Sequence, residues 1–289
     1  MITPKLWAAL NRPPAMHPLF RRTVVLPVVQ ERFYLSWANL VIGVILGLSQ
    51  YSPLLLFLLM PPILVIVGLT YGLDCALRVS GAITREHEHN TYHLLSLSPP
   101  GQMGAMWTLC TSALYRKHDF IRLRNMLHAA LLTGLYGGGA VTIIVVLVNL
   151  GLFTRYPQPV LPMLFAFGNF AAILGAIWAE YLQSAVLGVL LGMLISTYTH
   201  SRLDASLWAF GLYLLLQTAT YVLTVLVGFT LLPVVFERLS LMGDYTLAVL
   251  SLLRLLILVV GREALVVIIW RALLERLNLT TAELDFIKH

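Results

Sequence analysis

The sequence has little charge: only 11% of its 289 residues are aspartate, glutamate, lysine or arginine. A soluble domain carries about 25% charged residues, so this chain cannot cover a water-facing surface with charge. Its hydrophobic content of 59% and its mean hydropathy of +0.84 indicate a protein embedded in a lipid bilayer. No soluble domain is evident, and residues 1–289 are interpreted as a single membrane domain.

Strict alternation of apolar and polar residues is also missing, which excludes the pattern of membrane β-barrel strands. The apolar runs are about 20 residues long, as helical spans require, and a span in lipid must satisfy its own backbone groups. We therefore predict an all-α, polytopic integral membrane protein. The run at 160–199 is too long for one simple crossing and favours a span that continues into a kinked or interfacial helix. The six predicted spans lie at about residues 34–48, 54–77, 126–153, 160–199, 207–232 and 246–270.

Cysteine is scarce, with Cys75 and Cys110 as the only two. They are far apart, in segments predicted to lie at the cytoplasmic side, so neither a disulfide nor a metal site is expected. The nucleotide-binding sequence GxxxxGK[ST] is absent. We expect no catalytic activity, no cofactor and no metal in this chain itself.

Basic residues predict the orientation. Most of the 19 lysines and arginines fall outside the spans on one side, whereas the opposite loops hold only Arg155 and Arg238. Because basic residues concentrate at the cytoplasmic side, we predict that both termini, the loop 78–125 and the tail 271–289 are cytoplasmic, in an inner (cytoplasmic) membrane. The arginines are spread over loop ends, which favours the lipid bilayer over nucleic acid as the partner.

The N-terminal residues 1–33 alternate apolar and basic positions over part of their length. This pattern fits a helix lying in the membrane interface, and equally a basic flank that anchors the first span. The first 22 residues lack the sustained apolar core of a signal peptide, so we expect the first span to direct insertion.

Four ionisable residues fall inside the predicted spans: Glu180, Arg254, Arg262 and Glu263. Such residues are costly in lipid and usually functional. Arg254 and Arg262 are eight residues apart and share roughly one helix face, so we predict that Glu180 pairs with one of them. The functional interpretation is a polar cavity or gate; the alternatives are a buried structural pair and side chains that reach toward the interface.

Residues 83–101 read ITREHEHNTYHLLSLSPPG and interrupt the apolar runs with consecutive charged and histidine residues. His89 and His93 are four apart, and Glu86 precedes His89 by three, a spacing that on one helix face can hold a metal. The pattern is not HExxH and offers no obvious further ligand. A solvated polar face on a cytoplasmic helix is therefore favoured over a metal site.

The same stretch resembles the cytoplasmic loop of permease subunits of type-2 ABC exporters, where a sequence like E-R-E-x-G-T-x-x-x-L-L-x-x-(T/S)-P follows the second span. His87 and Asn90 replace the Arg and the Gly of that pattern, and residues 192–206 are weakly similar to the end of the family's fourth span. The resemblance implies a permease that works with a separate ATP-binding subunit, docked at this loop, and with a second permease copy. With two residues, and not three, between the Thr and the Leu pair, the positions that agree with the pattern are Glu86, Glu88, Thr91, Leu94, Leu95, Ser98 and Pro99.

Residues 101–125 depart from the family, which runs from the proline almost directly into its third span. Apolar residues at helical spacing predict an additional interfacial helix here; they are Met103, Met106, Trp107, Cys110 and Leu114. This departure supports a second interpretation, a permease-like structural subunit of a larger multisubunit membrane complex without transport activity. A third, a proton-driven transporter that uses Glu180, has less support because only one acidic residue is well placed.

Overall fold

The computed structural model describes residues 1–14, 20–21, 53–89, 91–92, 101–116, 119–148, 160–238 and 246–279. The regular structure in these residues is helical, as predicted. A short π-helix, η2 (Leu226–Leu231), joins two of the α-helices. The α-helices are α1 (Thr3–Asn11), α4 (Pro53–Glu88), α6 (Gly101–Tyr115), α7 (Asp119–Leu147), α8 (Val160–Ser196), α9 (Arg202–Val225), α10 (Leu232–Arg238) and α11 (Thr246–Arg276).

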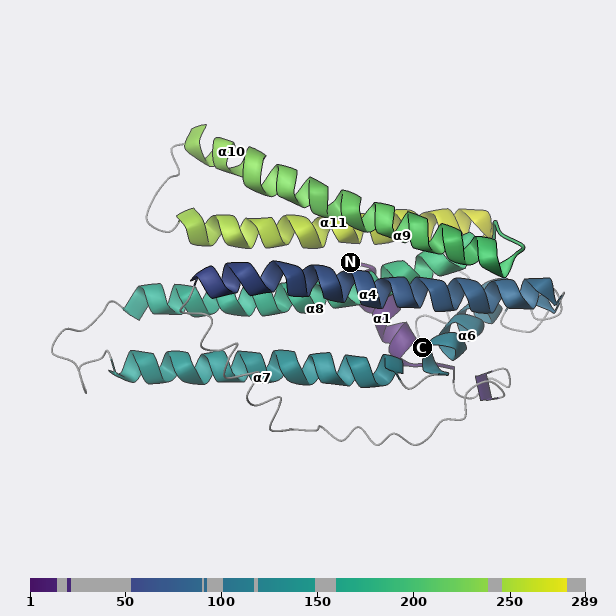
Figure 1. The fold of residues 1–289 in the computed structure, drawn as a ribbon, viewed down its shortest axis with the longest axis horizontal. Coiled ribbons are helices and arrows are strands. Elements are labelled where there is room, and N and C mark those ends of the chain that lie inside the picture. Colours follow the sequence, from purple (N-terminus) through teal and green to yellow (C-terminus); the bar gives the residue numbers. More distant parts are fainter. Residues whose placement is uncertain are drawn as a thin grey trace.

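The long helices run side by side, and α8 lies at the centre, in contact with α1, α4, α6, α7, α9 and α11 (Figure 1). The longest two are α4 and α8, with 36 and 37 residues. At 1.5 Å per residue each measures about 55 Å, whereas the hydrocarbon core of a bilayer is about 30 Å thick. Both are therefore long enough to cross a membrane and to continue beyond it.

Three of the described helical segments are long and apolar enough to cross a membrane: Leu127–Leu147, Phe167–Ser196 and Arg202–Arg238. They coincide with the third, fourth and fifth predicted spans. The second and sixth predicted spans fall in α4 and α11, and the first lies outside the described residues. The arrangement of six spans therefore stays a prediction.

The long apolar run at 160–199 forms one continuous helix, α8, and not a span followed by a separate kinked or interfacial helix. Its packing against α4 explains this difference. A Cβ added to Gly192 would lie 2.8 Å from the carbonyl oxygen of Ala76, and one added to Gly188 would overlap the carbonyl of Gly72. Small residues of this kind let membrane helices approach closely, so α4 supports α8 well past the length of one crossing.

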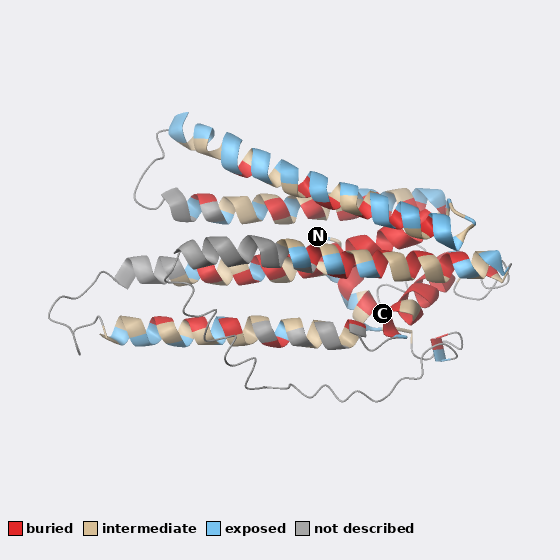
Figure 2. Cartoon of the chain, viewed as in Figure 1, coloured by how far each residue is buried: buried red, intermediate tan, exposed pale blue. Residues whose placement is uncertain are grey.

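The predicted additional helix is present as α6, although it is more enclosed than expected. It packs at the end of the bundle where buried residues gather (Figure 2). Its polar residues Thr108 and Thr111 are buried together with its apolar ones, so α6 does not show the single apolar face of an interfacial helix. The buried apolar residues include all five that predicted it: Met103, Met106, Trp107, Cys110 and Leu114.

The described part of the N-terminal segment is also buried. In α1, Leu6 and Leu10 are 1% and 0% exposed, and the ring of Trp7 meets that of Tyr181 edge to face at 5.4 Å. The hydroxyl of Tyr115 in α6 donates a hydrogen bond to the carbonyl of Leu10 (3.1 Å). One face of α1 therefore belongs to the packed core. The segment 17–33, for which the sequence predicted an interfacial helix or a basic flank, lies outside the described residues except for 20–21.

Candidate functional site

The predicted ion pair of Glu180 is formed with Arg262. The Arg262 Nη2 lies 2.6 Å from Glu180 Oε1, and the two side chains are only 1% and 0% exposed. Arg254, the other candidate, instead donates from Nε to the carbonyl of Gly228 (2.8 Å). The pair joins α8 to α11 inside the bundle, where each charge requires the other because burial removes both from water.

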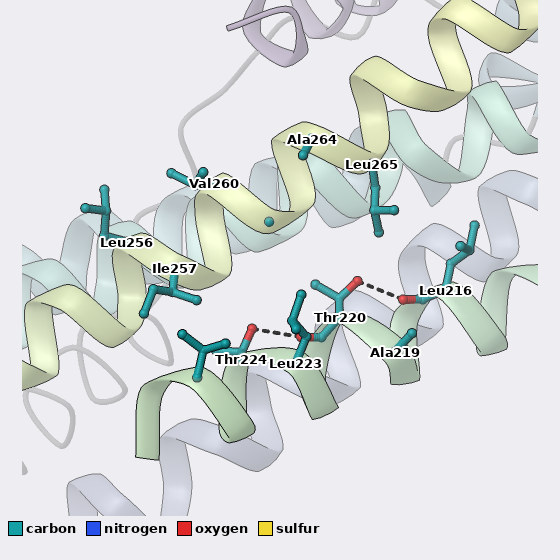
Figure 3. Close-up of a pocket in the computed structure, with 12 residues that line it drawn as sticks. Leu216, Ala219, Thr220, Leu223, Thr224, Leu256, Ile257, Val260, Ala264 and Leu265 are labelled. Carbon is teal, nitrogen blue, oxygen red and sulfur yellow. Dashed lines mark hydrogen bonds between the residues drawn. The ribbon is translucent and has the colours of Figure 1, made fainter. Parts of the chain in front are cut away.

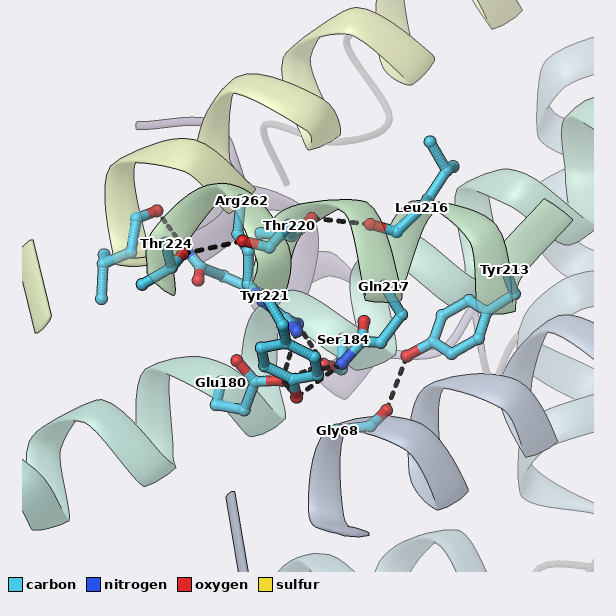
Figure 4. A network of polar contacts seen from close by, with 12 residues as sticks. Gly68, Glu180, Ser184, Tyr213, Leu216, Gln217, Thr220, Tyr221, Thr224 and Arg262 are labelled. Atoms are coloured by element: carbon cyan, nitrogen blue, oxygen red, sulfur yellow. Dashed lines mark hydrogen bonds and ion pairs between the residues drawn. The ribbon is translucent and has the colours of Figure 1, made fainter. Parts of the chain in front are cut away.

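Polar side chains of α8 and α9 surround the pair and complete a network (Figure 4). Glu180 Oε1 accepts hydrogen bonds from Ser184 Oγ (3.1 Å), Gln217 Nε2 (3.1 Å) and the Tyr221 hydroxyl (2.9 Å). Arg262 Nη1 donates to Ser184 Oγ (2.6 Å), and its guanidinium lies 5.0 Å from the centre of the Tyr221 ring. A single carboxylate oxygen thus holds groups from three helices.

Helix α4 closes the network on its remaining side. The hydroxyl of Tyr213 donates to the carbonyl of Gly68 (2.6 Å). A Cβ at Gly68 would stand 2.7 Å from Gln217 Nε2 and 2.8 Å from the Tyr221 hydroxyl. Glycine is therefore required at position 68 for α9 to bring its polar groups to Glu180.

The network retains unused hydrogen-bonding capacity. Glu180 Oε2, Gln217 Oε1 and Arg262 Nε are buried and have no hydrogen-bond partner. Buried polar atoms are normally paired, and each one left unpaired costs about 1–3 kcal/mol. These atoms are therefore available to take new partners if the packing of the three helices changes.

Sequence reasoning predicted Glu180 and Arg262 but missed Ser184, Gln217, Tyr213 and Tyr221. The signal available for Gln217 was an amide in the otherwise apolar run LYLLLQTATYVL, since an uncharged polar residue in a span commonly bonds across helices. The tyrosines gave no such signal, because their rings fit an apolar helix whether or not the hydroxyl has a partner.

Glu263 does not join the network, although it follows Arg262 directly. Its carboxylate accepts hydrogen bonds from the backbone N–H groups of Ile2 and Thr3 (3.2 Å for Thr3). These N–H groups open α1, where no side-chain cap is present. A carboxylate at a helix N-terminus satisfies free donors and complements the helix dipole, so Glu263 positions α1.

The predicted contact loop begins inside α4, because that helix runs to Glu88. Glu86 and Thr91 bond to each other through side chains and backbone, and His87 stacks on Tyr92 with ring centres 4.0 Å apart. His89 lies in the turn that follows α4, so the helical face expected for His89 and His93 is not formed by α4. Asn90, His93, Leu94, Leu95 and Pro99 lie outside the described residues.

Glu88 links the end of α4 to the start of α9. Its Oε1 accepts a hydrogen bond from the backbone N–H of Arg202 (2.6 Å). The N-cap of α9, Ser201, makes no side-chain cap bond of its own, so Glu88 supplies the cap from another helix. This role was not predicted, because the sequence does not show that the two helix ends meet.

The described residues hold no group of three or more histidine, cysteine, aspartate or glutamate side chains that could bind a metal. Cys75 and Cys110 are free and buried, and burial raises the pKa of the Cys110 thiol well above its usual value. Comparison with protein-family models, curated proteins and solved structures gave no match.

Proposed function

We propose that the chain is a membrane-spanning permease subunit of an ABC-type exporter, driven by a separate ATP-binding chain and paired with a second permease copy. The observation that carries this proposal is the Glu88 cap, which ties the stretch resembling the exporter loop to α9. In this proposal both termini and the 78–125 segment face the cytoplasm of an inner membrane, and six spans cross it.

The hydrogen bond between Glu88 and Arg202 connects the turn after α4 to α9, and α9 carries two residues of the buried network. A partner that displaces the turn would move Glu88 together with the first turn of α9. Gln217 lies 15 residues further along α9, about 22 Å away at 1.5 Å per residue. Movement of α9 along its axis would change the contacts that Gln217 and Tyr221 make with Glu180, and the unpaired atoms of the network are available as alternative partners.

A second candidate function is a structural subunit of a larger membrane complex. Two observations favour it: Glu86 and Glu88 are engaged within the chain, and α9 exposes a broad apolar face. Leu203, Leu207 and Trp208 of that face are 68%, 63% and 65% exposed. Such a face is suited to lateral contact with other membrane helices as well as with lipid.

Purification of the full chain from its own membrane, in mild detergent and without crosslinker, separates the two candidates. The permease proposal predicts that a P-loop ATPase co-purifies and that its ATP turnover depends on this chain. Glu88→Gln should weaken that dependence, whereas Glu275→Gln, at an exposed position of α11, should leave it unchanged. Recovery of other membrane subunits, with no nucleotide-hydrolysing chain, would favour the structural function.

A further inference from the structure

A groove separates α9 from α11 beside the polar network (Figure 3). Its volume is about 550 Å³, which is within the range of small-molecule sites. Leu216, Ala219 and Leu223 line it from α9, and Leu256, Val260 and Ala264 line it from α11. The groove lies along Arg202–Arg238, one of the segments able to span a membrane, so its mouth is suited to open toward lipid.

The groove offers no free hydroxyl donor along its length. Its two hydroxyls are already used: Thr220 donates to the carbonyl of Leu216 (2.7 Å) and Thr224 to that of Thr220 (2.8 Å). An occupant of this part must be apolar, because a polar group placed here would lose its hydrogen bonds to water without replacement. The groove is therefore suited to a hydrocarbon chain.

A cation stands at one end of the groove. On α11, Arg254 lies one helical turn before Ile257, which lines the groove. Arg254 also contacts Gly228. The residue before Gly228 is Val227, which lines the groove as well. The Nε of Arg254 donates to the carbonyl of Gly228, and its guanidinium lies 4.0 Å from the centre of the Phe229 ring. These neighbours fix the side chain at the groove end, on the π-helix η2.

The guanidinium of Arg254 is not neutralised by the described residues. An arginine carries five N–H donors, and in the described part of the chain one of them bonds to protein, to a neutral carbonyl. Arg262, by contrast, has Glu180. A charged side chain in a span normally has a partner, and the N–H edge of a guanidinium group suits a carboxylate or phosphate.

We propose that this groove binds a single-chain amphiphile with one anionic group, a long-chain carboxylate, with its hydrocarbon in the groove and its anion on Arg254. A phospholipid fits less well, because Arg254 is eight residues, about 12 Å, along α11 from Thr246, and a phospholipid headgroup remains at the membrane surface. The interpretation of the long-chain carboxylate as a transport substrate rests on the proposed permease function. Its binding in the groove does not.

The test uses the purified full chain in phosphatidylcholine nanodiscs and a photoreactive, diazirine-bearing palmitate, with labelled peptides mapped by mass spectrometry. Labelling is expected in 216–227 and 256–265, with competition by palmitate but not by its methyl ester. Arg254→Gln should weaken binding about tenfold, as loss of a charge-assisted hydrogen bond predicts. Ala219→Trp, which fills the groove from a lipid-exposed position, should abolish labelling.

The matched control is Arg276→Gln, because Arg276 also lies over an aromatic ring, that of Tyr198 at 4.7 Å, but is outside the groove. It should leave labelling unchanged, and thermal unfolding should show that each variant is folded. Equal competition by the methyl ester, equal labelling of the exposed face at 203–215, or no effect of Arg254→Gln would overturn the proposal. The assay contains no ATPase, so its result is independent of whether the permease proposal holds.

Discussion

The α4–α8 contact and the α9–α11 contact both contain small residues, with opposite results. Gly188 and Gly192 of α8 bring it against the backbone of α4, whereas a Cβ on Gly261, in the wall of the groove, would meet nothing within 4 Å. In the most apolar stretch of Phe167–Ser196, 72% of the chain is buried in the bundle, compared with only 11% in that of Arg202–Arg238. Small residues therefore close an interface where helices stay parallel, and leave a cavity where the helices separate.

The largest loss of stability is expected at the buried ion pair between Glu180 and Arg262. Arg262→Met should destabilise the protein by about 3–5 kcal/mol, because Glu180 would be left buried without its partner. Combining it with Glu180→Leu should recover much of the loss, since the double variant buries no charge. Thermal unfolding in detergent measures both; losses that simply add would contradict the pairing.

Packing of the α4–α8 contact gives the next effect. Gly188→Ala should destabilise by about 1–3 kcal/mol, because the added methyl group overlaps the carbonyl of Gly72. Gly261→Ala should instead be neutral or stabilising by up to about 1 kcal/mol, since it gains helix propensity without a clash. The same unfolding assay compares the two, and similar losses for both would remove the contrast between the interfaces.

Arg254→Gln should have a smaller effect on stability, about 1–2 kcal/mol, through loss of the contacts with Gly228 and Phe229. Unlike the loss at Arg262, it leaves no acidic partner among the described residues unpaired. Its main effect is expected on binding of the anionic amphiphile. A loss as large as that of Arg262→Met would indicate that Arg254 is a structural residue of the same kind.

The smallest effect is expected at the turn. Glu88→Gln should destabilise by about 0.5–1 kcal/mol, because it weakens the cap and the interaction with the helix dipole at the start of α9. Hydrogen exchange at the first turn of α9 is a direct readout, with the first turn of α8 as the internal reference. Unchanged protection at residues 202–205 would show that the cap is not used in solution.

The sequence was sufficient for the helical class and for the approximate positions of the long helices, because apolar runs and charged interruptions are local signals. It did not give their ends: α4 continues to Glu88, past the predicted end at 77, and α7 begins at Asp119, before the predicted start at 126. It narrowed the partner of Glu180 to two arginines on one face of α11 but could not choose between them. That choice depends on the axial offset of α8 and α11, which tertiary packing sets. The Glu88 cap could not be predicted for the same reason, because it depends on where helices of 24 and 36 residues end in space.

The contact between Glu263 and the first turn of α1 has a consequence for biosynthesis. Glu263 is separated from Ile2 by 261 positions in the chain and from Thr3 by 260. The carboxylate that caps α1 is therefore made only when nearly all of the protein has left the ribosome. We expect α1 to pack on α8 and α6 first and to receive its cap last. Formation of this cap would then serve as the completion step of assembly, and truncation before α11 should leave the first turn of α1 more open to protease.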